Sequence, residues 1–261
     1  MSTRRRLSGA LLVASLAAVL VAAVPAQASH SWGSYHWART SNPFTLQLRD
    51  NLTTSQWQSS LTGASGDWTQ SSVLNTTVVP GSITGKNLRR CQAAAGRVEI
   101  CNYKYGNNGW LGIASISVSG GHITAGTVKV NDTYYSTAQY NTPEWRNFVM
   151  CQEVGHIFGL DHQDEDFGNA NLGTCMDYTS NPGTNQHPNA HDYAQLETIY
   201  RHLDSTSTVG ASSAAVPAAA FGASVSEWGQ AIRYSSDGRP SLFVRELGHD
   251  TKVFTFVVWA L

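Results

Sequence analysis

Charge is scarce in this chain of 261 residues. Charged residues make up 13% of it, and 17 Lys and Arg stand against 18 Asp and Glu. Neutralising the phosphates of a nucleic acid takes a basic field, so this balance argues against a nucleic-acid partner. Outside the N-terminus, the sequence also lacks an apolar run of the roughly 20 residues that a membrane-spanning helix needs. With 41% apolar residues and eight Trp, the composition is nonetheless that of a folded chain.

Cysteine is also rare, and none of the four cysteines forms a C-x-x-C pair. That absence argues against a Cys₄ metal site. In an oxidising compartment four cysteines typically form two disulfides, for which the sequence allows three pairings. We favour Cys91–Cys101, which closes a short loop, with Cys151–Cys175 as the second disulfide.

The N-terminal residues 1–28 have the pattern of a secretory signal. Arg4–Arg6 precede the apolar stretch Leu7–Val24, and Ala26–Ala28 forms an A-x-A cleavage site. A membrane anchor is the alternative, but the stretch is rich in Ala rather than Leu. The arginines leave both Sec and twin-arginine export open. We therefore expect a secreted, extracellular protein that is free of the membrane after signal cleavage.

Strand and helix signals alternate over residues 29–205 without a repeat. Expected strands cover 44–48, 72–79, 97–103, 111–118 and 123–130. Expected helices lie near Trp57, from Thr142 to about Phe158 with Gly159 as terminator, and over 190–203. This stretch therefore predicts one domain of ordinary size.

The C-terminal part of the chain has a different character. Residues 206–225 are nearly all Ala, Ser, Thr, Val and Gly, which indicates a linker. Residues 226–261 predict a small β-meander with strands at 231–234, 241–247 and 251–259. A segment below about 40 residues without a disulfide seldom folds alone, so we expect this tail to dock on the main domain or to pair with another chain. The long apolar last strand could mediate self-association, but we expect a monomer.

One stretch of the predicted helix carries chemistry. Gln152 and His156 are four residues apart and share one face of the helix, with Glu153 beside them. Gly159 lets the chain leave the helix sharply, so His162 can return toward His156. Two imidazoles and a third group can thus meet one cation, with a carboxylate to take a proton from its water. This is the layout of a catalytic zinc site.

The same stretch resembles the metzincin zinc peptidases, whose pattern is H-E-x-x-H-x-x-G-x-x-H followed by a methionine turn. Glu153, His156, Gly159 and His162 stand at the matching offsets, and Met176 falls where the Met-turn is expected. The resemblance, closest to matrixin-type domains, covers residues 29–205. It implies an α+β zincin fold with a twisted mixed sheet, an edge strand over the cleft, an active-site helix, a Met-turn and a C-terminal helix.

The resemblance also implies a function, that of a secreted zinc-dependent endopeptidase. Glu153 is then the general base, Met176 an apolar floor under the ligands, and Tyr178 an optional helper near the metal or the oxyanion. A peptide or protein substrate is expected to lie extended along the edge strand 111–118. No cysteine precedes Cys91, so a latency switch based on a propeptide cysteine is excluded.

One position departs from the family pattern, because Gln152 stands where the first zinc-binding histidine is expected. Three interpretations follow. Gln152 can bind zinc through its side-chain oxygen, as a weaker ligand than imidazole. A substitute drawn from His187, His191 or Asp161 can take its place. Or the site is empty, and the protein is a catalytically inactive, zincin-like secreted binding protein.

The other ionisable residues suggest little chemistry. The acidic run of Asp161, Asp164, Glu165 and Asp166 is interpreted as a solvated rim, with Ca²⁺ as a second candidate cation. Five histidines are interpreted as ordinary surface or core residues: His30, His36, His122, His202 and His249.

Overall fold

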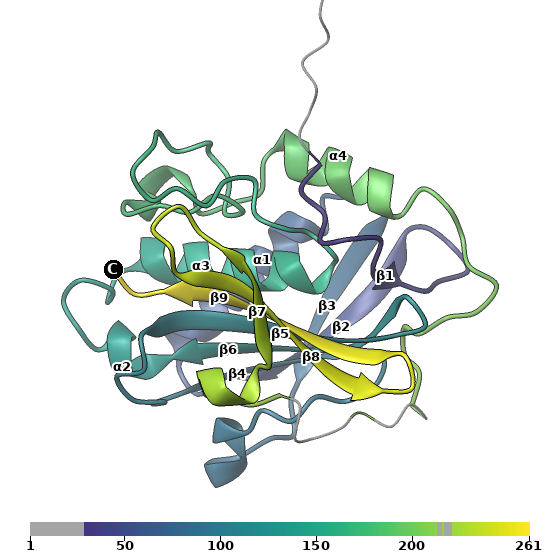
Figure 1. Ribbon diagram of the computed structural model, residues 1–261, viewed down its shortest axis with the longest axis horizontal. Coiled ribbons are helices and arrows are strands. Elements are labelled where there is room, and N and C mark those ends of the chain that lie inside the picture. Colours follow the sequence, from purple (N-terminus) through teal and green to yellow (C-terminus); the bar gives the residue numbers. More distant parts are fainter. Residues whose placement is uncertain (1–28, 213–215, 217–220) are drawn as a thin grey trace, which may run out of the picture.

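The computed structural model describes residues 29–212, 216 and 221–261. The predicted signal segment 1–28 and part of the predicted linker lie outside these described residues. Within the described ranges, no helix has the length and apolar character needed to cross a membrane. The fold is built on one nine-stranded mixed sheet that is covered by helices (Figure 1).

Five strands form the first half of the sheet, in the order β3-β2-β4-β6-β5. β2, β3, β4 and β6 run parallel, and β5 is antiparallel to β6. A sixth, two-residue strand, β1, pairs in parallel with the first residues of β6. Their bounds are β1 His36–Trp37, β2 Phe44–Asn51, β3 Leu74–Pro80, β4 Val98–Tyr103, β5 Trp110–Ser119 and β6 His122–Asn131. The five longer strands confirm those expected from sequence alternation.

Two long helices, α1 (Ser55–Trp68) and α3 (Pro143–Ile157), pack against each other and against the sheet. α4 (Ala190–Ile199) ends four residues before the predicted boundary at 203. The short helical segments are α2 (Asp132–Tyr135), η1 (Gly85–Arg89), η2 (Pro182–Thr184) and η4 (Val225–Glu227). The main apolar core lies between the sheet and the α1–α3 pair, where Trp68, Phe148 and Ile157 are fully buried.

The C-terminal tail continues the same sheet. Its strands β7 (Gln230–Tyr234), β8 (Pro240–Gly248) and β9 (Thr251–Trp259) match the predicted strands to within a residue or two. β9 pairs antiparallel with β5 along its whole length, and β8 and β7 follow outward (yellow in Figure 1). The tail therefore docks on the main domain.

This docking corrects one expectation about the substrate. The strand over 111–118 is not a free edge, because β9 occupies that edge and β5 lies between β6 and β9. An exposed strand edge offers unpaired N–H and C=O groups, and the apolar β9 is long enough to satisfy them. In this structure a substrate cannot add to β5.

Both favoured disulfides are present. Cys91–Cys101 joins the segment after η1 to β4, and Cys151–Cys175 joins α3 to the loop that carries Met176. The Cα atoms of each pair are 5.9 Å apart, within the usual range for disulfides. The second disulfide thus fixes the centre of α3 to the segment below it.

Candidate metal centre and active site

Local signals in the sequence set the ends of helix α3. The Thr142 side chain accepts a hydrogen bond from the Trp145 amide, and Pro143 occupies the first turn, where a missing N–H costs nothing. After the helix, Gly159 has φ of 99°, and a Cβ atom there would lie 2.7 Å from the Tyr35 carbonyl oxygen. Only glycine fits this turn, which sends the chain back toward α3.

Two further glycines allow close packing around the centre of α3. A Cβ atom on Gly112 of β5 would lie 2.7 Å from Glu153 Oε1. A Cβ atom on Gly155 would lie 2.5 Å from the sulfur of Met176 and 2.8 Å from Trp68. Gly112 therefore makes room for the carboxylate, and Gly155 lets Met176 pack directly against the helix. This placement is compatible with the predicted role of Met176 as an apolar floor.

His156 and His162 turn the same ring nitrogen toward each other, with the two Nε2 atoms 2.9 Å apart. The Nδ1–H of His156 donates to the carbonyl of Leu160 at 2.9 Å, and that of His162 donates to Glu165 Oε1 at 2.7 Å. These bonds assign the protons to Nδ1 and leave lone pairs on both Nε2 atoms. The pKa of His156 is well below its usual value, mainly because the ring is buried and secondly because His162 is close. Its imidazole is therefore neutral.

Two facing lone pairs repel unless a proton or a cation lies between them. Two nitrogens bound to one tetrahedral zinc at the usual Zn–N distance are about 3.3 Å apart. The observed Nε2–Nε2 separation of 2.9 Å is close to that value. Each ring is also held through Nδ1 by an oxygen acceptor, the usual support of a metal-binding histidine.

Gln152 and Glu153 complete the set. Both are fully buried, and none of their four side-chain oxygen and nitrogen atoms has a hydrogen-bond partner. Leaving such groups unpaired costs about 1–3 kcal/mol each, and more for a charge, so an unpaired cluster indicates a binding or catalytic site. Burial raises the pKa of the Glu153 carboxyl well above its usual range. These residues fit a divalent metal held by two imidazoles and an amide oxygen.

The candidate substitutes for Gln152 are engaged elsewhere. His187 is exposed and bonds Asp67 at 2.7 Å, while the His191 ring packs against that of His30. Asp161 lies on the Nδ1 side of His162, away from the Nε2 atom that faces His156, and it forms an ion pair with Arg233. Gln152 therefore stays the candidate for the third ligand.

Part of the acidic run is not a solvated rim. Asp161 is buried, and the Glu165 side chain is largely buried where it bonds Nδ1 of His162. Residues of the tail hold both carboxylates: Arg233 pairs with Asp161, and the Ser241 hydroxyl donates to Glu165 Oε2 at 3.1 Å. These engaged carboxylates give no support to the calcium interpretation. The tail thus contributes to the support of a candidate metal ligand.

The last strand of the tail covers the candidate site. The ring of Phe256 stacks on the His156 imidazole with 4.1 Å between centroids and 11° between planes. The Tyr178 hydroxyl, predicted to act near the metal or oxyanion, donates to the carbonyl of Val257 at 2.8 Å. In the β5–β9 ladder, Ala114 faces Phe256. β9 therefore occupies the place that was predicted for an extended substrate.

Comparisons with known proteins give only distant structural matches. No protein family and no curated protein matches the sequence. Among solved structures, myroilysin is similar at 13% identity and a TM-score of 0.36, covering 63% of this chain and 96% of its own. The hatching enzyme zinc-protease HCE-1 of Oryzias latipes is similar at 8% identity and a TM-score of 0.35, covering 64% of this chain and 94% of its own. Archaemetzincin from Archaeoglobus fulgidus is similar at 15% identity and a TM-score of 0.34, covering 58% of this chain and 99% of its own. Scores this low carry no argument, so the function proposed below depends on the residues themselves.

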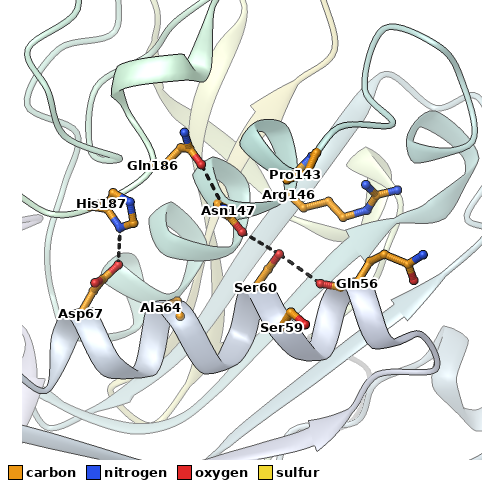
Figure 2. A pocket seen from close by; sticks show the side chains of 11 residues that line it. Gln56, Ser59, Ser60, Ala64, Asp67, Pro143, Arg146, Asn147, Gln186 and His187 are labelled. Carbon is orange, nitrogen blue, oxygen red and sulfur yellow. Dashed lines mark hydrogen bonds and ion pairs between the residues drawn. The ribbon is translucent and has the colours of Figure 1, made fainter.

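A separate groove of about 390 Å³ lies between α1 and α3 (Figure 2). It holds the Asp67–His187 pair at one end, and Ser60 and Asn147 bond to each other along its floor. Neither His156 nor His162 lines it. This groove is therefore distinct from the candidate metal centre.

The sequence did not predict Phe256, Arg233 or Glu165 as parts of the site. Glu165 carried a local signal, because it lies three residues after His162 and an acidic side chain at that distance can reach the ring. Phe256 and Arg233 carried none, since their positions depend on how a distant segment pairs with β5.

Proposed function

We propose that this chain is a secreted zinc-dependent endopeptidase. Gln152 Oε1, His156 Nε2 and His162 Nε2 are the proposed ligands, and Glu153 is the proposed general base. The observation that carries the proposal is the pair of buried side chains Gln152 and Glu153, whose polar atoms have no partner and which lie on the same helix as His156, the residue whose Nε2 faces that of His162. A protein, a peptide or both are the expected substrates.

Zinc, when bound, lowers the pKa of a coordinated water to about 7 and polarises the scissile carbonyl. Glu153 accepts the proton of the attacking water at a carboxylate oxygen as the new C–O bond forms. The same carboxyl then gives that proton to the leaving nitrogen as the C–N bond breaks. Its burial favours the first step, because a raised pKa makes the carboxylate a stronger base.

The other residues hold these groups in place. Leu160 and Glu165 fix the two imidazoles through Nδ1, so that both Nε2 atoms point inward. Tyr178 is placed to donate a hydrogen bond to a main-chain carbonyl, since it already does so to Val257 of β9. On a bound substrate the same bond stabilises developing negative charge on the carbonyl oxygen.

The proposal includes a closed state. β9 lies antiparallel to β5, gives a carbonyl to Tyr178 and places Phe256 on His156, so a substrate has to displace it. We therefore propose that the chain is latent until β9 moves or is removed. Because β8 and β7 join the sheet through β9, its displacement also disturbs Arg233 and Ser241, which support Asp161 and Glu165.

The second candidate is a non-catalytic binding protein with a zincin-like site. The observation in its favour is also β9, which blocks the cleft in this structure. The two candidates differ in what Glu153 does once the cleft is open.

The test is peptide hydrolysis by the zinc-loaded full chain and by Phe256→Ala, each with and without Glu153→Gln. The peptidase proposal predicts turnover that is stronger in Phe256→Ala and is lost with Glu153→Gln. Glu197→Gln, on the exposed face of α4, is the matched control and is expected to keep activity. No turnover in any zinc-loaded variant would support the binding protein instead.

A further inference from the structure

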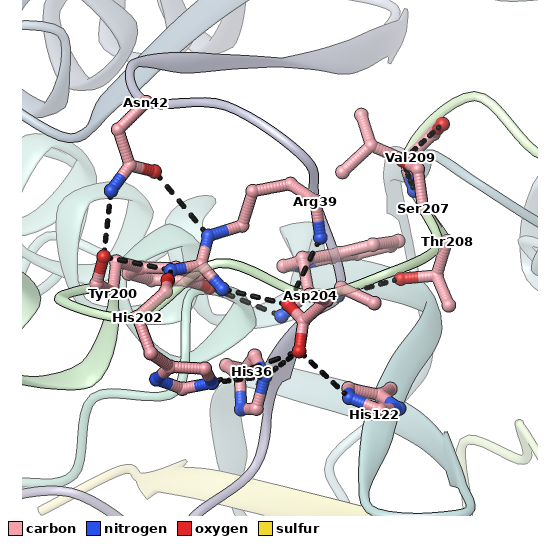
Figure 3. Close-up of polar contacts among 12 residues, drawn as sticks. His36, Arg39, Asn42, His122, Tyr200, His202, Asp204, Ser207, Thr208 and Val209 are labelled. Carbon is pink, nitrogen blue, oxygen red and sulfur yellow. Dashed lines mark hydrogen bonds and ion pairs between the residues drawn. The ribbon is translucent and has the colours of Figure 1, made fainter.

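Three histidines and an aspartate meet at a point remote in sequence from the site described above (Figure 3). His36 Nε2 and His122 Nε2 each lie 3.3 Å from Asp204 Oδ1. His202 Nε2 lies 3.1 Å from His36 Nε2 and 3.7 Å from the same oxygen. The ligand atoms of His36, His122 and Asp204 therefore lie within 4.8 Å of one another, and His202 joins the group from the side of His36.

The fold brings these residues together from three distant segments. The parallel pairing of β1 with β6 sets His36 directly opposite His122. His202 and Asp204 follow the end of α4, where the Asp204 amide donates to the Arg39 carbonyl at 2.9 Å. The ring planes of His122 and His202 are each nearly perpendicular to that of His36. The rings thus approach edge-on, which lets their nitrogens share one centre.

Hydrogen bonds to atoms outside the cluster orient His36 and Asp204, so that His36 Nε2 and Asp204 Oδ1 face the other members. His36 Nδ1–H donates to the Ser34 carbonyl at 2.9 Å, which leaves the lone pair of a neutral His36 on Nε2. Arg39 occupies the other carboxylate oxygen, Asp204 Oδ2, at 2.8 Å through its guanidinium and at 3.1 Å through its amide. Oδ1 is therefore left to face the imidazoles.

In this arrangement two hydrogen-bond acceptors, His36 Nε2 and Asp204 Oδ1, face each other. The Nε2 lone pair of a neutral His36 points toward Asp204 Oδ1 at 3.3 Å, a contact that only a shared proton or a shared cation relieves. Imidazole nitrogens held through Nδ1 by a backbone carbonyl are typical metal ligands, as is a carboxylate whose second oxygen is hydrogen-bonded. His36, His122 and Asp204 offer three ligand atoms within 4.8 Å of one another, and the exposed His202 beside them is the candidate fourth ligand of a tetrahedral zinc site.

We propose that His36, His122, His202 and Asp204 form a second metal site, which binds Zn²⁺ or a similar divalent transition metal and has a structural role. With the side chain of His202 turned in as the fourth ligand, no position is left open for a water, as in structural zinc sites. Bound metal ties the segment of β1 and the segment after α4 to the start of β6. Because a structural metal binds the folded state, its binding free energy adds to folding.

The experiment separates this site from the candidate active site. Untagged full chain carrying His156→Ala and His162→Ala is stripped with a chelator, dialysed and titrated with Zn²⁺ and, separately, Co²⁺. We expect about one metal ion per chain, the absorption spectrum of tetrahedral Co²⁺, and a higher midpoint of thermal unfolding with zinc. Adding His122→Gln and His202→Gln is expected to abolish all three.

The control is His249→Asn, which replaces an exposed histidine in the β8–β9 turn and is expected to leave metal binding unchanged. Circular dichroism of each metal-free variant verifies that it is folded. The proposal is overturned if the His156→Ala/His162→Ala chain binds neither metal, which would show that a proton holds the cluster together. It is equally overturned if binding survives the loss of His122 and His202. Neither result bears on hydrolysis, which depends on the other site.

Discussion

The phenyl ring of Phe256 lies flat on the imidazole of His156, with 4.1 Å between their centroids. One residue belongs to the last strand of the chain and the other to the helix that carries the candidate metal ligands. A substrate residue bound beside the metal would need the space that Phe256 fills. The tail is therefore both a structural part of the sheet and an obstacle at the candidate site.

Weakening the contact of Phe256 is expected to open the site. Truncating a buried Phe to Ala typically costs about 3–5 kcal/mol, and each 1.4 kcal/mol is tenfold in an equilibrium. If even a third of this loss falls on the docking of β9, the open population of Phe256→Ala rises about 5- to 15-fold. The measurement is the rate of hydrolysis of an unstructured peptide by the zinc-loaded chain.

The matched control is Phe44→Ala, which removes a buried Phe of β2 away from the cleft. It is expected to destabilise the fold by a similar amount without raising the rate. Equal acceleration in both variants would attribute the effect to general loosening and contradict the role given to β9.

Gln152 determines how strongly the candidate centre binds zinc. Gln152→His replaces an amide oxygen with an imidazole nitrogen, a better zinc ligand, and is expected to raise affinity by about tenfold or more. Gln152→Ala removes the third ligand and is expected to lower it by a similar factor. Competition with a chromogenic chelator measures both, in a His122→Gln/His202→Gln background. Gln58→His, on the exposed face of α1, controls for an added histidine; an equal gain there would exclude Gln152 as a ligand.

The disulfide Cys151–Cys175 links the residue before Gln152 to the residue before Met176. Its removal by Cys151→Ala/Cys175→Ala is expected to lower the free energy of unfolding by about 3 kcal/mol, from the entropy of the loop it closes. Zinc affinity is expected to fall as well, because α3 and the Met176 segment are then free to separate. Urea unfolding and chelator competition measure the two effects.

The other disulfide provides the control. Cys91→Ala/Cys101→Ala is expected to cost a similar free energy of unfolding, about 3 kcal/mol, with no change in zinc affinity. Loss of zinc affinity in both double variants would mean that global stability, not the link to Met176, sets the binding.

Local patterns predicted much of the fold. Thr142, Pro143 and Gly159 marked the ends of α3 because caps and breakers act within a few residues. Alternating apolar residues predicted the strands, and both favoured cysteine pairings are present. The approach of His162 to His156 was predicted from the helical period and one turn, which are also short-range properties.

What could not be predicted depends on contacts between distant segments. The pairing of β9 with β5 joins residues about 140 positions apart, as in the bond between Ser115 and Thr255. The His36–Asp204 contact spans a separation of 168 residues, and no spacing rule connects positions so far apart. Asp161 appeared to be a solvated acid because its partner Arg233 lies in a strand whose docking site was unknown.

Lys129 gives the chain a predictable pH dependence. It is fully buried in β6 and donates to the carbonyls of Phe221 and Gly222, and burial lowers the pKa of its ammonium from the usual value to about 7, with Glu227 opposing. Between about pH 7 and 10.5 the unfolded chain binds this proton and the folded chain does not, so stability rises with pH. From pH 7 to pH 9 the gain is about 2 kcal/mol. Urea unfolding at both pH values measures it, and Lys129→Met is expected to lose this rise. An equal rise in the variant would assign the pH dependence to other groups and leave Lys129 with its ordinary pKa.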